Sequence, residues 1–254
     1  MDALRIQGGA RLSGTLAVDG SKNASLPAMA AAILSTDTVQ LRDVPPLSDI
    51  NNMVRLLGEI GCEVVHDDRT MTIRTVDPTA NHARYDIVRT MRASICVLGP
   101  LLAARGEARV SMPGGCAIGD RPVDLHLRGL EALGATITLD GGDIIARADK
   151  LKGATIFLGG PFGSTVLGTA NVMSAAVLAE GTTIIESAAC EPEITGLANM
   201  LNAMGADVSG AGTPRIEIHG VESLGNVDYQ VIPDRIVAGT IAMAVAITNG
   251  DAKI

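Results

Sequence analysis

Aromatic side chains are nearly missing from this sequence of 254 residues, which has no tryptophan, two tyrosines and two phenylalanines. A core without large rings must be built from Ala, Val, Leu, Ile and Met. Hydrophobic residues make up 47% of the chain, which indicates a globular protein rather than a disordered one. The length suits one large domain or two small ones.

Long apolar runs and an excess of positive charge are missing as well. No apolar stretch reaches the ~18 residues of a membrane helix, and the first residues, MDALR, do not form the apolar core of a signal peptide. The net charge is −8, whereas nucleic-acid-binding domains are usually basic. We therefore expect a cytoplasmic protein that binds neither membrane nor nucleic acid, although converging basic groups can still bind small anions.

Paired cysteines are a third absence. Cys62, Cys96, Cys116 and Cys190 are scattered and form no CxxC pair. This spacing fits a reducing compartment and predicts neither a disulfide framework nor a zinc site. The histidines are dispersed and no Asp-rich metal motif occurs, so we expect no metal and no cofactor.

The sequence does contain an internal repeat. Three similar segments, 56–64, 130–137 and 201–208, share a glycine at Gly61, Gly134 and Gly205, and these glycines are 73 and 71 residues apart. Apolar residues recur before each glycine at i, i+3 or i+4, and i+7, which predicts an amphipathic helix with a glycine C-cap. A short β-branched strand follows each glycine.

A second, more uniformly apolar helix is expected ahead of each unit, at residues 24–34, 93–104 and 169–179. Helices that are apolar all round should be buried, with sheets packed around them. The repeating unit is therefore helix, strand, helix, strand, strand. This pattern predicts an α/β domain of three repeats, with inner helices and outer sheets, over residues 22–230.

A fourth copy of the inner helix begins at residue 236, and its turn falls at Asn249-Gly250. Repeat units need neighbours, so we expect a truncated chain or one part of a larger protein. Residues 1–21 would belong to an incomplete second domain that residues 231–254 begin. A first strand at 3–6 is expected to pair with this last segment. The segments 75–84 and 229–235 are expected to be connections.

Residues 113–125, PGGCAIGDRPVDL, are the first candidate for chemistry. The glycines allow close backbone approach to a ligand, and Pro122 suits the first position of a helix. Cys116 would then lie just ahead of a helix N-terminus, which favours anions, and Arg121 adds a fork for phosphate or carboxylate. From spacing alone, a glycine-rich turn with an incidental cysteine explains the stretch equally well.

Polar residues also recur at the start of each inner helix. Lys22, Arg92, Thr165 and Asp234 occupy equivalent places in successive repeats. Repeat symmetry would gather them on one face as a floor that binds anions, below Cys116. Taken one by one, they are also explained as an exposed lysine on a turn, a solvated basic face, a glycine-rich loop and a simple N-cap.

Several of these stretches resemble one family. GSKNA at 20–24, RTMRAS at 89–94, residues 113–125, LAEGTTII at 178–185 and PDR at 233–235 resemble the enolpyruvyl transferases that act on UDP-N-acetylglucosamine, in the same order along the whole chain. The resemblance implies an inside-out α/β barrel fold, with two domains and an active site between them. It also implies transfer of the enolpyruvyl group of phosphoenolpyruvate to the 3′-hydroxyl of UDP-N-acetylglucosamine, the first committed step of peptidoglycan synthesis, and hence of cell wall biogenesis, cell shape and cell division.

The resemblance also implies roles for individual residues. Lys22, Asn23 and Arg121 would bind phosphoenolpyruvate, and Cys116 would donate a proton and form a covalent adduct with it. The sugar nucleotide would contact Arg92 and the run Arg121, Pro122, Val123, Asp124 and Leu125. Thr165 and Val166 match a uridine-contacting loop, although STVLG stands where many members have PSVGA, and Asp234 and Arg235 lie in the matching PDR stretch.

The family's second domain supplies the carboxylate that takes the hydroxyl proton and a further arginine for phosphoenolpyruvate. Neither is expected within these residues, so we expect the polypeptide alone, without the missing C-terminal half, to be inactive or nearly so. Two alternatives stay open: the related shikimate-pathway enolpyruvyl transferase, against which the PGGC sequence argues, and a non-catalytic fragment that binds a UDP-sugar.

Overall fold

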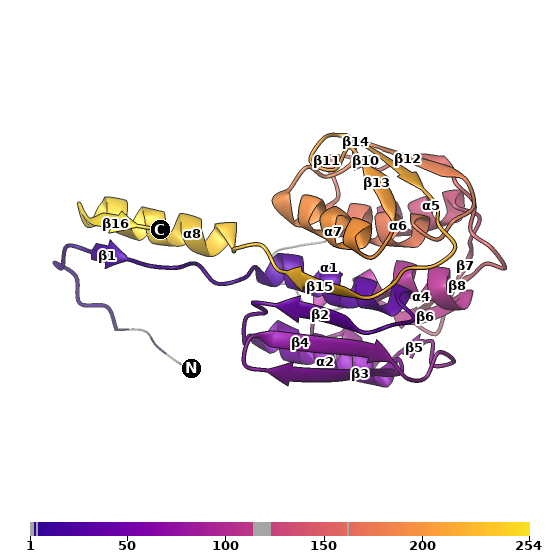
Figure 1. The fold of residues 1–254 in the computed structure, drawn as a ribbon, viewed down its shortest axis with the longest axis horizontal. Coiled ribbons are helices and arrows are strands. Elements are labelled where there is room, and N and C mark those ends of the chain that lie inside the picture. The colour runs from indigo at the N-terminus through magenta and orange to yellow at the C-terminus, as the bar shows by residue number, and fades with distance from the viewer. Residues whose placement is uncertain (1–2, 4, 114–122, 162) are drawn as a thin grey trace.

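The computed structural model describes residues 3, 5–113, 123–161 and 163–254. Figure 1 shows a body in which helices lie inside three sheets, and an arm of β1, α8 and β16 that extends away from the body. The body positions the candidate site, because its inner helices all begin at one end.

The inner helices are built from small and apolar residues. They comprise α1 (Lys22–Ala31) with η1 (Ala32–Leu34), η2 (Arg92–Val97) with α4 (Leu98–Arg105), and α6 (Val166–Ala176). Every residue of α6 from Gly168 onward is buried. Their burial confirms the prediction for the apolar helices, although α6 begins three residues before the predicted start.

The amphipathic helices are α2 (Ser48–Glu59), α5 (Asp124–Ala132) and α7 (Pro192–Ala203). Each contacts an inner helix on its apolar side. Gly61, Gly134 and Gly205 follow them with φ values of 81°, 95° and 107°. These left-handed conformations confirm the predicted glycine caps. A single short turn of helix, α3 (Tyr85–Val88), precedes η2.

The three sheets share one pattern, in which a parallel pair of strands is followed by two antiparallel ones. The first sheet has the order β15 (Val227–Gln230), β2 (Val39–Arg42), β4 (Thr70–Thr75), β3 (Cys62–Asp67). The second has the order β5 (His82–Ala83), β6 (Glu107–Ser111), β8 (Asp143–Arg147), β7 (Thr136–Asp140). The third has the order β13 (Asp207–Ser209), β14 (Arg215–His219), β12 (Thr182–Glu186), β9 (Thr155–Phe157).

The parallel strands β5, β9 and β15 each come from the preceding repeat and join the sheet of the next one. Because β15 pairs with β2, the last repeat returns to the first sheet and the three sheets surround the helices. The expectation that 75–84 and 229–235 are only connections was therefore wrong. Both segments contribute to strands whose partners are distant in sequence, so local pattern did not reveal them.

The arm contains β1 (Ser13–Thr15), α8 (Arg235–Ile247) and β16 (Asp251–Lys253), and β1 pairs with β16 in parallel. The pairing of the first strand with the last segment was predicted, but its position at 3–6 was wrong. Of those residues, the described ones are exposed and form no strand, because β16 pairs over three residues with 13–15 instead. No residue of α8 is buried.

The core is aliphatic, as its composition requires. Its largest fully buried side chains are all Met, Leu or Ile. Phe157 and Tyr85 are exposed, whereas Tyr229 is half-buried and donates a hydrogen bond to the carbonyl of Gly196 at 2.8 Å. None of the described helices combines the length and the hydropathy that crossing a bilayer requires.

Candidate active site

A cavity of about 360 Å³ lies where the inner helices begin. Five residues predicted from the sequence line it together: Lys22, Asn23, Arg92, Val166 and Arg235. The other lining residues are Leu26, Pro27, Asp49, Thr90, Met91, Ala93, Leu167 and Glu193. The structure thus brings together the starts of α1, η2, α6 and α8, which are far apart in sequence.

The start of α1 is fixed by local hydrogen bonds. Ser21 is the N-cap, and its hydroxyl accepts a hydrogen bond from the amide of Ala24 at 3.2 Å. The amide of Lys22 donates to Asp234 Oδ2 at 3.2 Å. Gly20 is required just before the cap, since a Cβ there would lie 1.8 Å from the carbonyl oxygen of Asp43.

Lys22 has a carboxylate partner inside the cavity. Its Nζ donates a hydrogen bond to Asp49 Oδ2 at 2.8 Å, and both side chains are partly exposed. Asp49 lies in the first turn of α2, where a negative charge is also favourable for the helix dipole. An anionic ligand that binds Lys22 must therefore compete with Asp49.

Arg235 is held in a similar way by a carboxylate of α7. Its Nε lies 2.9 Å and 3.2 Å from the two oxygens of Glu193. Glu193 is 3% exposed, whereas the Arg235 side chain is 49% exposed. The hydrogen bond to Glu193 raises the pKa of Arg235. This pair ties the first turn of α8 to the body beside the start of α1.

Arg92 is the first residue of η2 and is half-buried at the edge of the same cavity. Its charge acts on groups behind the cavity. Burial raises the pKa of Cys96 to about 12, against the smaller opposing effect of Arg92. Burial lowers the pKa of His126 to about 3, and the charge of Arg92 lowers it further.

Three of the predicted residues, Thr165, Asp234 and Val123, do not line the cavity. Thr165 caps α6 by accepting a hydrogen bond from the amide of Gly168 at 3.2 Å. Asp234 caps α8 through the amides of Ile236 and Val237, as the simple-cap interpretation held, and also accepts the amide of Lys22. Val123 is buried next to the start of α5, and none of these three lines the cavity.

Asp124 and Leu125 form the first turn of α5 and are exposed and half-buried respectively; neither lines the cavity. Cys116, Arg121 and Pro122 lie outside the described residues. Among the described cysteines, burial raises the pKa of Cys62 and Cys96, which disfavours the reactive thiolate, and Cys190 is exposed.

Sequence reasoning missed Asp49 and Glu193. Asp49 starts an amphipathic helix and Glu193 follows Pro192 at the start of another, where acidic residues are common for the dipole alone. No sequence signal separates that general role from a contact with Lys22 or Arg235. The contacts depend on the docking of α2 and α7 against the inner helices.

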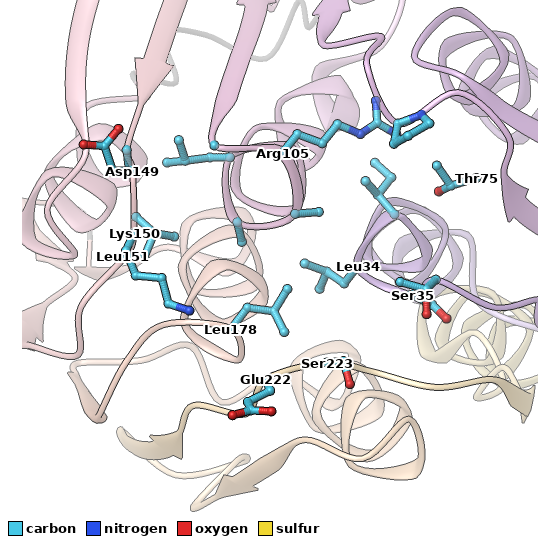
Figure 2. Close-up of a pocket in the computed structure, with 18 residues that line it drawn as sticks. Leu34, Ser35, Thr75, Arg105, Asp149, Lys150, Leu151, Leu178, Glu222 and Ser223 are labelled. Atoms are coloured by element: carbon cyan, nitrogen blue, oxygen red, sulfur yellow. The ribbon is translucent and has the colours of Figure 1, made fainter.

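A larger cavity of about 580 Å³ lies at the opposite ends of the inner helices (Figure 2). Leu34, Arg105 and Leu178 reach it from the ends of η1, α4 and α6. Asp149, Lys150 and Glu222 add charges of both signs at its exposed edge. With Arg105 included, two cations face two carboxylates, so the charges favour a ligand of neither sign. None of the described residues that were predicted to be catalytic or substrate-binding lines this cavity.

The smaller cavity therefore has the character of a site for an anion. It combines the N-terminal ends of α1 and α6 with three cationic side chains and two carboxylates. Within the described ranges, no group of three or more His, Cys, Asp or Glu side chains is arranged to hold a metal ion.

Sequence comparisons show which family this chain belongs to. A sequence model described as EPSP synthase (3-phosphoshikimate 1-carboxyvinyltransferase) matches residues 6–254. Two curated relatives named UDP-N-acetylglucosamine 1-carboxyvinyltransferase are each 51% identical. The one from Methylacidiphilum infernorum matches over 251 residues, 99% of this chain and 59% of the relative. The one from Desulforapulum autotrophicum matches over 254 residues, 100% of this chain and 60% of the relative. The chain thus spans about 59% of the length of the curated relatives it matches.

Solved structures have the same fold. The enolpyruvyl transferase NikO from Streptomyces tendae superposes with a TM-score of 0.80 at 25% identity, over 94% of this chain and 56% of that one. An EPSP synthase from Acinetobacter baumannii superposes with a TM-score of 0.74 at 20% identity, over 96% and 55% of the two chains, and supports the fold alone. These matches confirm the predicted α/β architecture with inner helices, although here three separate sheets, not one closed barrel, surround them.

Proposed function

Since the chain belongs to the EPSP synthase (3-phosphoshikimate 1-carboxyvinyltransferase) family, we propose that it carries one side of an active site that transfers the enolpyruvyl group of phosphoenolpyruvate to the 3′-hydroxyl of UDP-N-acetylglucosamine. The observation that carries this proposal is the cavity that Lys22, Asn23, Arg92, Val166 and Arg235 line together. The names of the relatives at 51% identity favour UDP-N-acetylglucosamine over 3-phosphoshikimate as acceptor. In the cell, this reaction is the first committed step of peptidoglycan synthesis, in the cytoplasm.

In this proposal, phosphoenolpyruvate binds at the start of α1. Lys22 and Asn23 hold the phosphate and carboxylate there, together with Arg121. Lys22 then exchanges Asp49 for a phosphate oxygen, and a charge-assisted hydrogen bond to phosphate replaces the one at 2.8 Å. The exchange keeps Lys22 partnered in both states, so the site is not left with an uncompensated cation.

The sugar nucleotide lies across the other inner-helix ends. Arg92 and the run from Arg121 through Pro122, Val123 and Asp124 to Leu125 contact it, and Thr165 and Val166 face its uridine. Asp234 and Arg235 close the far edge of the site. Asp234 accepts the amide of Lys22 and Arg235 pairs with Glu193, which supports a single connected region for both substrates.

The chemistry needs a proton donor and charge stabilisation. The 3′-hydroxyl oxygen forms a bond to C2 of phosphoenolpyruvate while C3 takes a proton from the thiol of Cys116. Phosphate then leaves C2, and loss of a proton from C3 restores the double bond. A thiol with a reference pKa of about 8.5 is mostly protonated at neutral pH, so Cys116 can act as a general acid; nearby cations favour its thiolate, which forms the covalent adduct.

The relatives are longer than this chain, which covers about 59% of them. We propose that their additional length supplies the carboxylate that takes the hydroxyl proton and a further phosphoenolpyruvate-binding arginine. The 254-residue polypeptide by itself should then release phosphate from the two substrates at a negligible rate. Normal turnover by the purified chain would contradict this part of the proposal.

Alkylation of Cys116 tests directly whether this chain forms its side of the active site. Fosfomycin, an epoxide that mimics phosphoenolpyruvate, should label Cys116 faster when UDP-N-acetylglucosamine is present, as measured by mass spectrometry of peptides. Lys22→Ala should slow this labelling, whereas Lys150→Ala, at the opposite cavity, should not. Exposed Cys190 gives the background rate of an ordinary thiol.

Equal and nucleotide-independent labelling of Cys116 and Cys190 would instead favour a non-catalytic fragment.

The choice of acceptor is tested separately by thermal unfolding. UDP-N-acetylglucosamine should raise the melting temperature and 3-phosphoshikimate should not, because only a ligand that binds the native state stabilises it. The reverse result would support the shikimate-pathway alternative.

A further inference from the structure

Asn171 lies in the middle of α6, behind the cavity, and its side chain is 0% exposed. Val166 and Leu167, which line the cavity, begin the same helix. A buried amide must have its hydrogen bonds made within the protein. The partners of Asn171 therefore show what the residue does.

The backbone fixes the orientation of the Asn171 amide. The amide N–H of Gly99 in α4 can only donate, and it lies 2.6 Å from Asn171 Oδ1. The carbonyl of Ile95 in η2 can only accept, and Asn171 Nδ2 donates to it at 2.9 Å. In a flipped amide, Nδ2 would face the N–H of Gly99, donor against donor, and Oδ1 would face the carbonyl of Ile95, acceptor against acceptor. The orientation of the Asn171 amide is therefore unambiguous.

The second N–H of Asn171 Nδ2 then meets His126 Nδ1 at 3.1 Å. Since Asn171 donates here, His126 Nδ1 must accept and cannot carry a proton. The only ring proton of His126 is therefore on Nε2, and the imidazole is neutral. Burial and the charge of Arg92 act in the same direction, because both disfavour an imidazolium.

His126 belongs to the first turn of α5 and is 2% exposed. Its amide donates to the carbonyl of Val123 at 3.0 Å, and the amide of Leu127 donates to the same carbonyl at 3.1 Å. The ring of His126 thus connects α6 to the turn that contains residues 123–125.

The contact between α4 and α6 has room only for glycine. A Cβ at Gly99 would lie 2.2 Å from the backbone oxygen of Asn171 and 2.5 Å from its Oδ1. This close approach is what lets one asparagine reach Gly99, Ile95 and His126 at once. Three segments of the body, η2 with α4, α6 and α5, meet at this single side chain.

We propose that Asn171 is a positioning residue: by holding His126 in its neutral Nε2–H form, it fixes the first turn of α5 against the inner helices. The further claim that this turn serves the sugar nucleotide rests on the proposed function. A neutral His126 also adds no second positive charge beside Arg92, whose charge acts on the ring.

The ring state is measured on the 254-residue chain by ¹⁵N NMR of its four histidines, with His126 assigned by the loss of its signals in His126→Asn. Wild-type His126 should show the neutral Nε2–H form and should not titrate between pH 5 and 8. In Asn171→Asp, the carboxylate cannot donate, so His126 should take a proton on Nδ1. A wild-type His126 that is protonated on Nδ1, or that titrates near pH 6.5, would overturn the proposal.

Asn202→Asp is the matched control. Asn202 in α7 makes the same kinds of backbone hydrogen bond, donating to the carbonyl of Val208 and accepting its amide, each at 2.8 Å, but neither bond involves a histidine. Hydrogen exchange at the amides of His126 and Leu127 should be about fivefold faster in Asn171→Asp than in Asn202→Asp, because only the former loses the anchor of α5. Equal exchange in the two variants would overturn the positioning role, even if both are destabilised.

Calorimetry with UDP-N-acetylglucosamine separates this inference from the proposed function. Asn171→Asp should weaken binding about fivefold or more relative to Asn202→Asp. Binding by neither the wild type nor the variants would refute the proposed ligand, while the ring and exchange results would still decide the role of Asn171. Equal binding by wild type and Asn171→Asp would remove the link between this residue and the nucleotide.

Discussion

Lys22 and Arg235 both face the candidate site with carboxylate partners already in place. Asp49 and Glu193 compensate them from α2 and α7, and only Glu193 is fully buried. A partly exposed pair such as Lys22 with Asp49 is worth about 1 kcal/mol or less. An anion can therefore displace Asp49 from Lys22 at little cost, whereas separating Arg235 from Glu193 leaves a buried charge and costs more.

Removing the competitor of the anion gives the first prediction. Asp49→Asn should bind phosphoenolpyruvate about two- to fivefold more tightly, because Lys22 no longer exchanges one carboxylate for another. Asp140→Asn, an exposed change in β7, controls for the altered net charge. Affinity is measured by calorimetry on the same chain. Weaker binding in Asp49→Asn alone would show that Asp49 orients Lys22 rather than competing for it.

The buried pair gives the second prediction. Glu193→Gln should lower the free energy of unfolding by about 1–3 kcal/mol, since it weakens charge-assisted hydrogen bonds at a buried acceptor. Glu63→Gln is its counterpart, because Glu63 pairs with Arg74 while both side chains are more than half exposed. That change should cost less than about 1 kcal/mol. Equal losses in urea unfolding would contradict the importance of burial here.

Residue-level prediction from the sequence was uneven for physical reasons. Lys22 and Arg92 were found because each opens a repeated helix, so symmetry predicts that they meet, whereas Arg235 was named only because its PDR stretch resembles the family. Asp49 and Glu193 were not found, since their contacts span 27 and 42 residues of sequence and depend on helix docking.

At the level of elements, the repeated glycines show how equal patterns conceal unequal surroundings. Gly61, Gly134 and Gly205 all have positive φ after an amphipathic helix. A Cβ at Gly61 would lie 2.1 Å from the carbonyl oxygen of Asp77, whereas Gly134 and Gly205 have nothing within 4 Å. The periodic sequence predicts the caps, and only the packing of the connection after β4 distinguishes the three.

These surroundings predict a ranking of three equivalent substitutions. Gly134→Ala and Gly205→Ala should each cost about 1–2 kcal/mol, the strain of a left-handed alanine. Gly61→Ala should cost more than either, because the backbone of Asp77 must also move. Urea unfolding of the three variants provides the comparison, and a Gly61→Ala variant no less stable than the other two would contradict the close approach of Asp77 to Gly61.

The junction of α5 with α6 makes stability depend on pH. The folded-state pKa of His126 is lowered to about 3, so the unfolded chain, with a pKa near 6.5, binds the additional proton. This contribution to stability is complete above about pH 6.5 and is lost as the pH falls toward 3. Between pH 6 and 4, the unfolding free energy of the wild type should fall by about 1 kcal/mol per pH unit more than that of His126→Asn. Parallel pH profiles for the two proteins would exclude a neutral buried ring.

For the whole molecule, the inner helices determine where function can reside. They all run from the smaller cavity at Lys22, Arg92 and Val166 to the larger one at Leu34, Arg105 and Leu178. Helix N-termini favour anions and C-termini favour cations. The smaller cavity, at the N-termini, is therefore the better site for an anion, although the other cavity is larger. The repeat predicted from the sequence that the helix starts converge. The pairing of β15 with β2, which returns the last repeat to the first sheet, could not be predicted, because the sequence of a four-residue strand does not indicate which strand it pairs with.

Binding of both substrates at the starts of the inner helices is tested by an NMR titration of the ¹⁵N-labelled chain with UDP-N-acetylglucosamine and then phosphoenolpyruvate. We expect the largest amide shifts among the described residues at the starts of the inner helices, around Lys22, Arg92 and Val166. Residues of the larger cavity, around Arg105 and Lys150, should not respond. Shifts concentrated at the larger cavity, or no saturable shifts at Lys22, Arg92 and Val166, would contradict this prediction.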